Sequence, residues 1–320
     1  MFFNGNKMET NEKYSSGCTD TVLMIEPVAF DYNPETAVNN YFQQRNALSE
    51  SETQRLALAE FRGMVHILEN AGVRVISVQD KPFPHTPDSI FPNNWISFHL
   101  NNHVVFYPMF AENRRLERRM DILLEIENKL NRKFYYTDYS KYEMENIFLE
   151  GTGSIVPDRI NRIAYAGISP RTDKKLFLKF CREMNFHPVY FHATQEVDGE
   201  QMPIYHTNVM MCVADKYAVV CSDSVRDKTE RENLLKNMTE SGKEIIEIST
   251  EQMNCFAGNM LQLQNGEGEK LLVMSCAAHE SLSEEQISRL ESFNKLLVVP
   301  VSTIEKNGGG SVRCMIAEVF

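Results

Sequence analysis

The stretch Val312-Arg313-Cys314-Met315-Ile316, close to the end of the 320-residue chain, is the last of five similar segments. In each segment a small or polar turn leads into apolar residues, a pattern that predicts a turn followed by a buried strand. The other four segments are Pro92-Asn93-Asn94-Trp95-Ile96, Thr152-Gly153-Ser154-Ile155-Val156, His206-Thr207-Asn208-Val209-Met210 and Ala257-Gly258-Asn259-Met260-Leu261.

The spacing of these five segments is nearly constant. Aligned on Asn94, Ser154, Asn208, Asn259 and Cys314, they follow one another at intervals of 60, 54, 51 and 55 residues. A near-constant period predicts stacked or radially arranged copies of one supersecondary unit. Equivalent positions of the copies would then converge on one axis, which is a natural place for an active site.

Each segment is followed by the pattern of a second strand, a helix and a third strand. In the first copy, a strand pattern over 91–100 reaches the turn residues Asn101-Asn102, and a second strand pattern covers 103–108. Residues 112–130 then have apolar side chains at helical spacing. In later copies, possible capping boxes that mark helix starts are Thr229 with Glu232 and Ser283 with Gln286.

The fifth segment ends the chain before a complete unit can follow it. The missing parts are present at the other end, where Thr21 to Glu26 has a strand pattern and residues 49–68 a helical one. Pairing the N-terminal strand with the Cys314 strand would close a ring and protect its edges. The predicted fold is therefore α/β, a five-bladed β/α propeller of ββαβ units around a pseudo-fivefold axis. Residues 1–20 are expected to form a frayed N-terminus, and 21–320 a single domain.

Composition excludes several classes of function. The net charge is −11, and there is no basic run, which argues against a nucleic-acid surface. No stretch approaches the roughly 20 apolar residues of a membrane span, and no signal-peptide core is present. The seven cysteines lack CxxC spacing, so neither a disulfide framework nor a zinc site is indicated. We expect a cytoplasmic protein without metal or cofactor, and the sequence leaves a homo-oligomer open.

Three residues of the segments could carry covalent catalysis. Cys314 is the candidate nucleophile, because Gly308 to Gly310 before it allow the backbone to approach a ligand closely. His206 precedes Asn208 by two residues, so both side chains would point to one face of a strand. Glu150 stands at a strand entrance. Each has an ordinary structural explanation alone, but a nucleophile, a proton shuttle and an orienting carboxylate on equivalent elements predict an enzyme.

The order and spacing of the motifs resemble the pentein, or guanidine-modifying, superfamily, and most closely citrulline-utilisation hydrolases and amidinotransferase-like proteins. The resemblance spans residues 20–320, and its motifs are Pro87-Asp88-Ser89-Ile90-Phe91, Glu150-Gly151, Gly167-Ile168-Ser169-Pro170-Arg171-Thr172, His206-Thr207-Asn208 and the terminal cysteine segment. It implies the five-bladed fold. It also implies a cysteine-dependent hydrolase of the amidinohydrolase or deiminase type, acting on a C–N bond of a guanidino or ureido amino acid.

The resemblance also implies roles for single residues. Cys314 would attack the substrate carbon, and His206 would protonate the leaving nitrogen and then activate water. Glu150 would support the substrate and the histidine. Asp88 would lie near the substrate, and Arg171 would clamp its α-carboxylate through directional hydrogen bonds.

Three asparagines complete the predicted substrate-binding set: Asn93, Asn94 and Asn208. Arginine deiminases, by the same resemblance, have aspartates where this chain has Asn94 and Asn208. An asparagine side chain offers both a donor and an acceptor, which suits a neutral ureido group. We therefore expect a citrulline-like substrate, while a neutral guanidine or an arginine derivative whose charge is met by Glu150 also fits.

Other interpretations stay open at this point. An amidinotransferase would use the same covalent step but pass the amidino carbon to an amine, and a non-catalytic pentein would use the fold only as a binding surface. Residues 27–48 would lie at the mouth of the ring, either as a substrate-covering loop or as an ordinary connection. Arg114 and Arg115 are interpreted as the exposed start of a helix.

Overall fold

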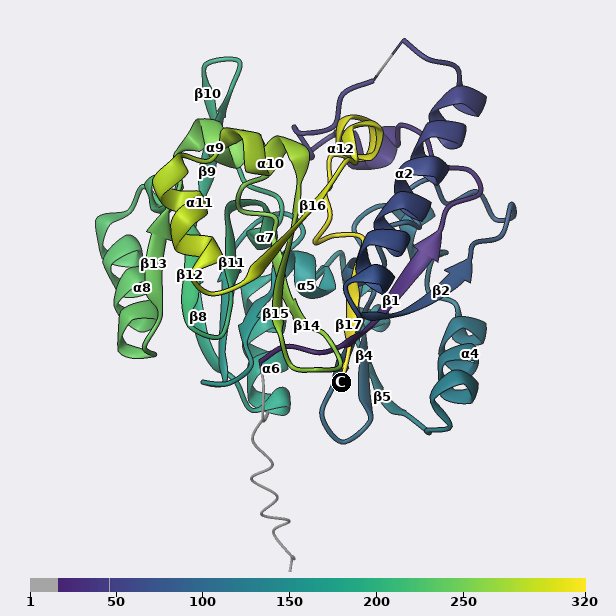
Figure 1. The fold of residues 1–320 in the computed structure, drawn as a ribbon, viewed down its shortest axis with the longest axis horizontal. Helices are drawn as coiled ribbons and strands as arrows, with labels where there is room; N and C mark the ends of the chain where they lie inside the picture. Colours follow the sequence, from purple (N-terminus) through teal and green to yellow (C-terminus); the bar gives the residue numbers. More distant parts are fainter. Residues whose placement is uncertain (1–16, 46) are drawn as a thin grey trace, which may run out of the picture.

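The computed structural model describes residues 17–45 and 47–320 (Figure 1). The expected frayed N-terminus, residues 1–20, lies outside this part except for 17–20, where Cys18 and Thr19 are buried. The described part contains five three-stranded sheets and a separate hairpin of β9 (Thr194–Val197) and β10 (Glu200–Pro203).

All five three-stranded sheets have the same topology. In each sheet the central strand pairs antiparallel with one neighbour and parallel with the other. With the central strand in the middle, the sheets are β3 (Ile96–His99), β4 (His103–Phe106), β5 (Tyr135–Asp138); β6 (Val156–Asp158), β7 (Ile163–Gly167), β8 (His187–Phe191); β11 (Met211–Val213), β12 (Tyr217–Val220), β13 (Glu244–Glu247); β14 (Leu261–Gln264), β15 (Lys270–Ser275), β16 (Lys295–Val299); and β17 (Ala317–Val319), β1 (Thr21–Glu26), β2 (Arg74–Gln79).

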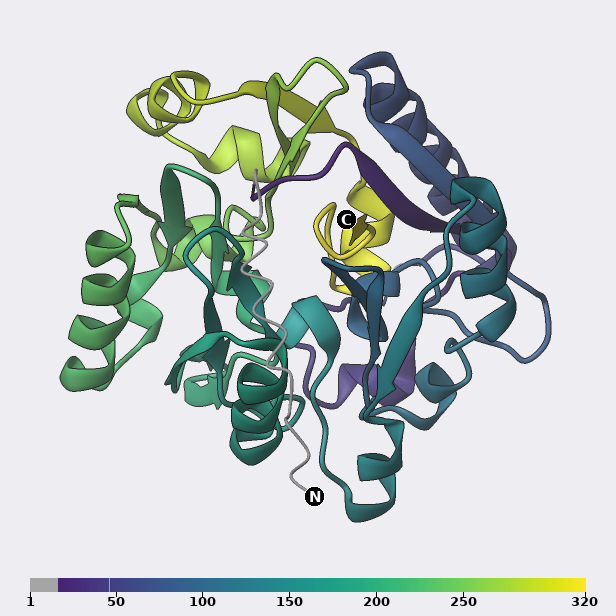
Figure 2. The same ribbon diagram turned by 90° about the horizontal axis from the view of Figure 1, so that it is seen from below.

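Helices connect the two parallel strands of every sheet, as a parallel connection requires. Figure 2 shows the longer ones toward the periphery of the molecule. They are α2 (Glu50–Asn70), α4 (Met120–Leu130), α6 (Lys174–Met184), α8 (Lys228–Glu240) and α11 (Glu284–Glu291). The shorter elements are α1 (Pro34–Ala37), α3 (Glu112–Arg115), α5 (Gly151–Ser154), α7 (Thr207–Met210), α9 (Thr250–Asn254), α10 (Cys276–Ser281), α12 (Ser302–Gly308), η1 (Pro92–Asn94), η2 (Ser140–Glu145) and η3 (Ser222–Ser224).

The two ends of the described chain meet in one sheet. Strand β17 pairs antiparallel with β1, with Thr21 opposite Val319 and Leu23 opposite Ala317. The side-chain hydroxyl of Thr19 adds a hydrogen bond to the carbonyl oxygen of Val319. The predicted pairing of the N-terminal strand with the C-terminal segment is therefore confirmed.

Three of the five aligned positions lie in short helices, with Asn94 in η1, Ser154 in α5 and Asn208 in α7, while Asn259 and Cys314 lie in the connections before β14 and β17. The predicted strand follows each of these positions. Glu150 precedes α5, His206 precedes α7, and Cys314 lies in a turn between α12 and β17. The prediction that His206 and Asn208 share a strand face is therefore wrong. An apolar run of three to five residues cannot distinguish a strand from a helical turn by periodicity alone.

The apolar core lies between the sheets and their helices. Val22 of β1 packs in one cluster with Phe61 and Met64 of α2 and with Val273 of β15. Cys314 belongs to the same cluster, so the turn that bears it is set in closely packed surroundings.

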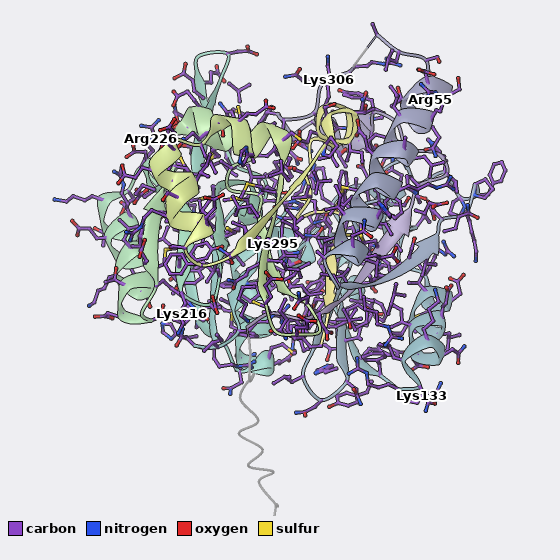
Figure 3. The ribbon with its side chains drawn as sticks, viewed as in Figure 1. Arg55, Lys133, Lys216, Arg226, Lys295 and Lys306 are labelled. Carbon is purple, nitrogen blue, oxygen red and sulfur yellow. The ribbon has the colours of Figure 1, made fainter. Side chains whose placement is uncertain are left out.

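Three features outside the core bear on function. Within residues 17–45 and 47–320, no helix combines the length and apolar character that crossing a bilayer requires. In the same residues, no group of three or more His, Cys, Asp or Glu side chains could hold a metal ion. Figure 3 shows the labelled basic residues distributed over separate segments, among them Arg55 on α2 and Lys306 on α12.

Candidate active site

Cys314 and His206 line one small buried cavity. Asp88, Asn94 and Arg171 also line it, so five of the predicted residues share one space. The cavity has a volume of about 10 Å³, about what one water molecule requires. Any substrate of amino-acid size therefore needs the surrounding segments to move.

Glu150 is a fully buried carboxylate with three partners. Its Oε2 lies 2.7 Å from Nε2 of His206 and 3.5 Å from Nη1 of Arg171, and its Oε1 accepts the backbone N–H of Phe110 at 2.8 Å. Burial alone would raise the pKa of Glu150, but the charge of Arg171 and the hydrogen bond with His206 outweigh it and lower the pKa to about 2. The carboxylate is ionised near neutral pH.

His206 is neutral near neutral pH. Burial lowers its pKa to about 4, although the hydrogen bond with Glu150 opposes this shift. Because an ionised carboxylate can only accept, Nε2 carries the proton, which leaves a lone pair on Nδ1. The imidazole can therefore take a proton from a thiol or a water molecule.

Gly153 leaves space beside the imidazole. A Cβ at this position would lie 2.8 Å from Nδ1 of His206 and 2.5 Å from Nδ2 of Asn94. Both side chains therefore face the same point next to α5, and a residue larger than glycine would displace one of them.

The sulfur of Cys314 receives two side-chain N–H groups. Nδ2 of Asn259 lies 3.3 Å and Nδ2 of Asn208 3.5 Å from Sγ. Oδ1 of Asn259 accepts the backbone N–H of Arg313, which fixes the orientation of that amide. Three of the five aligned positions thus meet at the sulfur, where the two donors favour negative charge. Asn259 was not among the predicted site residues, although the repeat alignment already contained it.

Several buried polar atoms at the site have no hydrogen-bond partner among the described residues. They are Oδ1 of Asp88, Nδ2 of Asn94 and Oδ1 of Asn208. Buried polar groups in proteins are rarely left unpaired, so these atoms are available to a ligand. Both side-chain polar atoms of Asn93 are also unpaired. Asp88 and Asn94 line the cavity, whereas Asn93 and Asn208 do not, although Asn208 contacts the sulfur of Cys314.

The segment around α1 covers the cavity and engages its charged groups. Oδ2 of Asp88 accepts from Nδ2 of Asn33 at 2.8 Å and from Oγ1 of Thr36 at 3.1 Å. Arg171 donates through Nε to Oδ1 of Asn39 at 2.8 Å and through Nη2 to the carbonyl oxygen of Thr36 at 2.8 Å. Burial raises the pKa of Asp88, against the pull of the nearby Arg114.

Arg114 is a functional candidate that the sequence interpretation missed. It was expected at an exposed helix start, but it is only 2% exposed and lines the cavity. Helix α3 has only four residues and is followed by a turn at 116–117, and Arg114 donates to Glu117 and Asn94 in the interior. The spacing of three residues between Arg114 and Glu117 was the available signal, because such pairs meet on a helical turn. Arg115 is partly exposed and donates to the carbonyl oxygen of Met109.

Comparisons with known proteins give one family, from a family model, and one fold, from solved structures. The family model described as N,N dimethylarginine dimethylhydrolase, eukaryotic, matches residues 26–320. The substrate-bound N-terminal domain of ArgZ, an arginine dihydrolase from the ornithine-ammonia cycle in cyanobacteria, is 17% identical, with 93% of this chain and 97% of that chain covered and a TM-score of 0.70. No curated protein matches the chain.

Two further solved structures share the fold. Unliganded AgrE is 19% identical, with 94% of this chain but 39% of the AgrE chain covered and a TM-score of 0.68. DDAH from Pseudomonas aeruginosa, a cysteine-to-serine variant complexed with citrulline, is 15% identical, with 94% and 99% coverage and a TM-score of 0.62.

Proposed function

Because the chain belongs to the family described as eukaryotic N,N dimethylarginine dimethylhydrolase, we propose that Cys314 is its catalytic nucleophile, with His206 and Glu150 as partners. Membership confirms the predicted resemblance to guanidine-modifying enzymes and the predicted class, a hydrolase of guanidino amino acids. The structure of ArgZ covalently bound to a reaction intermediate supports a covalent adduct for this chain as well. The observation that carries the assignment of residues is the buried Glu150–His206 hydrogen bond of 2.7 Å beside the cavity that Cys314 lines.

The chemistry follows from the protonation states. The thiol of Cys314 gives its proton to Nδ1 of His206, and Sγ bonds to the substrate carbon. The imidazolium, stabilised by the ionised Glu150, then protonates the nitrogen that leaves as an amine. In the second half, His206 takes a proton from water, the resulting hydroxide adds to the same carbon, and Sγ leaves with its electron pair.

The unpaired polar atoms favour a ureido substrate. Oδ1 of Asp88 and Oδ1 of Asn208 can accept from N–H groups, and Nδ2 of Asn94 can donate to an oxygen. A citrulline-like ureido group presents both kinds of atom on the carbon that Cys314 would attack. We propose as its binding residues Asp88 and Asn94, which line the cavity, and Asn208, which does not line it but donates to the sulfur of Cys314. Asn93 has neither position, and its backbone carbonyl oxygen accepts from Thr152, so it is a support for α5.

Arg171 is the proposed clamp for the substrate α-carboxylate. The segment 27–48, of which residue 46 lies outside the described residues, is the proposed lid. Asn39 and Thr36 occupy the donors of Arg171 that a carboxylate would take. Opening of the segment would free these donors and admit the substrate.

The predicted fold, domain organisation and cellular compartment are part of this proposal. The five sheets of one topology support a five-bladed β/α propeller with 21–320 as one domain. All seven cysteines are free thiols, which supports a reducing compartment such as the cytoplasm.

The test is a substrate panel. We would offer the purified protein arginine, citrulline, methylated arginines and N-acylated arginines, and measure ammonia and the amine products. Citrulline should give the highest kcat/KM, and Cys314→Ala should abolish turnover. Turnover that survives Cys314→Ala would refute the assignment of the nucleophile. Adding an amine acceptor distinguishes the transferase alternative, which predicts an amidino-transfer product in place of ammonia.

A further inference from the structure

Most N–H groups of the Arg114 guanidinium already donate to other groups of the protein. Nε and Nη2 donate to the two carboxylate oxygens of Glu117 at 2.9 and 3.0 Å, and Nη2 also donates to the carbonyl oxygen of Phe91 at 3.2 Å. The side chains of Arg114 and Glu117 are 3% and 1% exposed. Because its charge is already met by a bidentate carboxylate, Arg114 is poorly suited to clamp a substrate carboxylate.

One remaining donor of Arg114 sets the orientation of Asn94. Nη1 of Arg114 lies 2.7 Å from Oδ1 of Asn94. A guanidinium has donors and no acceptor, so the Asn94 atom that it contacts must be the amide oxygen. The amide nitrogen of Asn94 is thereby turned to the other side.

The amide nitrogen of Asn94 faces the reaction centre. It is buried without a partner among the described residues, and the same point next to Gly153 lies 2.5 Å from it and 2.8 Å from Nδ1 of His206. Asn94 also lines the cavity together with Cys314. The site therefore presents an N–H donor, and not an acceptor, next to the atoms that react.

We propose that the buried Arg114–Glu117 pair is a positioning device that locks the Asn94 amide with its NH2 group toward the substrate, and so selects a carbonyl oxygen on the attacked carbon. Glu117 and Arg114 are thus positioning residues, and Asn94 is the residue that would contact the substrate. The inference deepens the proposed function and rests on it.

The fixed orientation of the Asn94 amide should distinguish ureido substrates from guanidinium substrates. A ureido carbon carries an oxygen that accepts from Asn94, whereas every nitrogen of a protonated guanidinium is a donor and leaves the Asn94 NH2 unpaired. Leaving a buried donor unpaired corresponds to a preference of roughly 10- to 100-fold in kcat/KM for the ureido compound.

The first test replaces the hydrogen-bond donor of Asn94 by an acceptor. In Asn94→Asp, Arg114 binds one carboxylate oxygen and the other oxygen, now an acceptor, faces the substrate at nearly unchanged volume. The ratio of kcat/KM for L-citrulline to that for L-arginine should fall by at least roughly 100-fold. A ratio that stays within threefold of the wild type would overturn the inference.

The second test removes the lock. The double variant Arg114→Leu with Glu117→Leu replaces a buried ion pair by apolar side chains of similar size, a change that proteins often tolerate. The Asn94 amide is then free to turn over, so the citrulline-to-arginine ratio should fall roughly tenfold, because its oxygen can now accept from a guanidinium. A purely structural role would instead lower kcat/KM for both compounds alike and leave the ratio unchanged, which would also overturn the inference.

A matched control uses another buried ion pair away from the cavity. Lys243 and Asp158 lie 3.1 Å apart with side chains 0% and 2% exposed. The double variant Lys243→Leu with Asp158→Leu should change stability but not the citrulline-to-arginine ratio.

Binding measurements separate this inference from the proposed function. With Cys314→Ala as the inactive background, calorimetry gives the dissociation constants of L-citrulline and L-arginine without turnover. If neither compound binds and neither is turned over by the wild type, the proposed function fails and the inference with it. If citrulline is turned over but Asn94→Asp does not change the ratio of kcat/KM for citrulline to that for arginine, the inference alone fails. A wild type that prefers arginine in both assays also contradicts it.

Discussion

Gly153 shows how a single residue constrains the reacting side chains. A methyl group there would stand 2.5 Å from Nδ2 of Asn94 and 2.8 Å from the His206 ring, so Gly153→Ala must displace one of them. A misplacement on the order of 1 Å can cost a factor of roughly 100 in rate, and we expect kcat/KM to fall by about that factor. Steady-state kinetics measure the effect.

The control for Gly153 is Gly63, in the middle of α2, where an added Cβ meets nothing within 4 Å. Gly63→Ala should leave kcat/KM unchanged and stabilise the fold by about 0.5–1 kcal/mol. Equal kinetics for the two variants would contradict the placement of Gly153 at the reaction centre.

The protonation of His206 and Glu150 makes folding pH-dependent. The pKa of His206 is about 4 in the folded state against roughly 6.5 in the unfolded chain, so only the unfolded state binds the proton as pH falls from about 6.5 to 4. The free energy of unfolding should decrease over that range. Glu150, with a folded pKa of about 2, adds a loss that begins only as pH falls through about 4.5.

Denaturant unfolding between pH 7 and 4 measures this dependence. Buried His99 also has a lowered pKa, so the informative quantity is the difference between the wild type and His206→Gln. The variant should lose less stability between pH 6.5 and 4. The same pH dependence in both proteins would show that His206 takes up its proton in the folded state.

At the scale of single residues, the sequence could identify candidate catalytic residues but not whether a side chain points into the protein or toward solvent. Cys314 and Asn94 were recognisable because they stand at aligned positions of the repeat, and His206 because it precedes the aligned Asn208 by two residues. The structure places all three at one cavity. Arg114 was misjudged because its spacing of three residues from Glu117 shows that the two side chains meet but not whether the pair faces the interior, as it does in the structure.

At the scale of elements, the segment from Asn33 to Gln43 is held by side chains of the site. Asn39 supplies the oxygen that accepts from Nε of Arg171, and Thr36 supplies a carbonyl oxygen. Asn39→Ala removes a charge-assisted hydrogen bond, and a loss of about 1.5–3 kcal/mol should raise the open population at least roughly tenfold. Limited proteolysis should then cut residues 27–45 correspondingly faster.

The lid also predicts protection by a ligand. Citrulline added to Cys314→Ala should slow cleavage in residues 27–45 if the segment closes over it. Unchanged cleavage, with ligand or with Asn39→Ala, would mean that the segment is an ordinary surface connection. Ser283→Ala, which removes a helix cap on α11, is a control of similar size in another unit.

Helix starts show why element boundaries were only partly predictable. The capping box of Ser283 with Gln286 is confirmed at the start of α11. The box of Thr229 with Glu232 is wrong, because Asp227 caps α8 and accepts the N–H of Glu230. Both candidates satisfy the same sequence rule, and the competition between neighbouring cap residues is decided by where the chain enters the helix. Residues 112–130 similarly form α3 and α4 rather than one helix.

At the scale of the whole molecule, the strand β17 closes the arrangement of sheets. Ala317 and Val319 are buried, and Arg313 donates to Glu318 at 2.9 Å. Removing residues 317–320 should lower the free energy of unfolding by at least about 3 kcal/mol, because buried side chains and the partner of β1 are lost together. Urea unfolding followed by circular dichroism measures this change.

The matching control leaves the five sheets intact. Inserting two glycines between Asp198 and Gly199, in the turn of the β9–β10 hairpin, should change the free energy of unfolding by less than about 0.5 kcal/mol. If truncation of β17 is equally mild, the pairing of β1 with β17 does not contribute to stability.

The repeat period made the global topology the most predictable level. Near-equal spacing and the unfinished fifth unit sufficed to predict the β1–β17 pairing, because a ring with one gap has only one closing partner. The helical turns at the inner ends of the sheets were not predictable, since three-residue segments carry no period.

The pairing of Thr21 with Val319 also determines when the site can form during synthesis. At a synthesis rate of roughly 5–20 residues per second, β17 is made on the order of 15–60 s after β1. Strand β1 has no antiparallel partner during this time. Cys314 also follows Glu150 and His206 in the sequence, so a chain interrupted before residue 314 holds the proposed carboxylate and base but not the proposed nucleophile. The proposed site is therefore complete only once the segment that leads into β17 has been made.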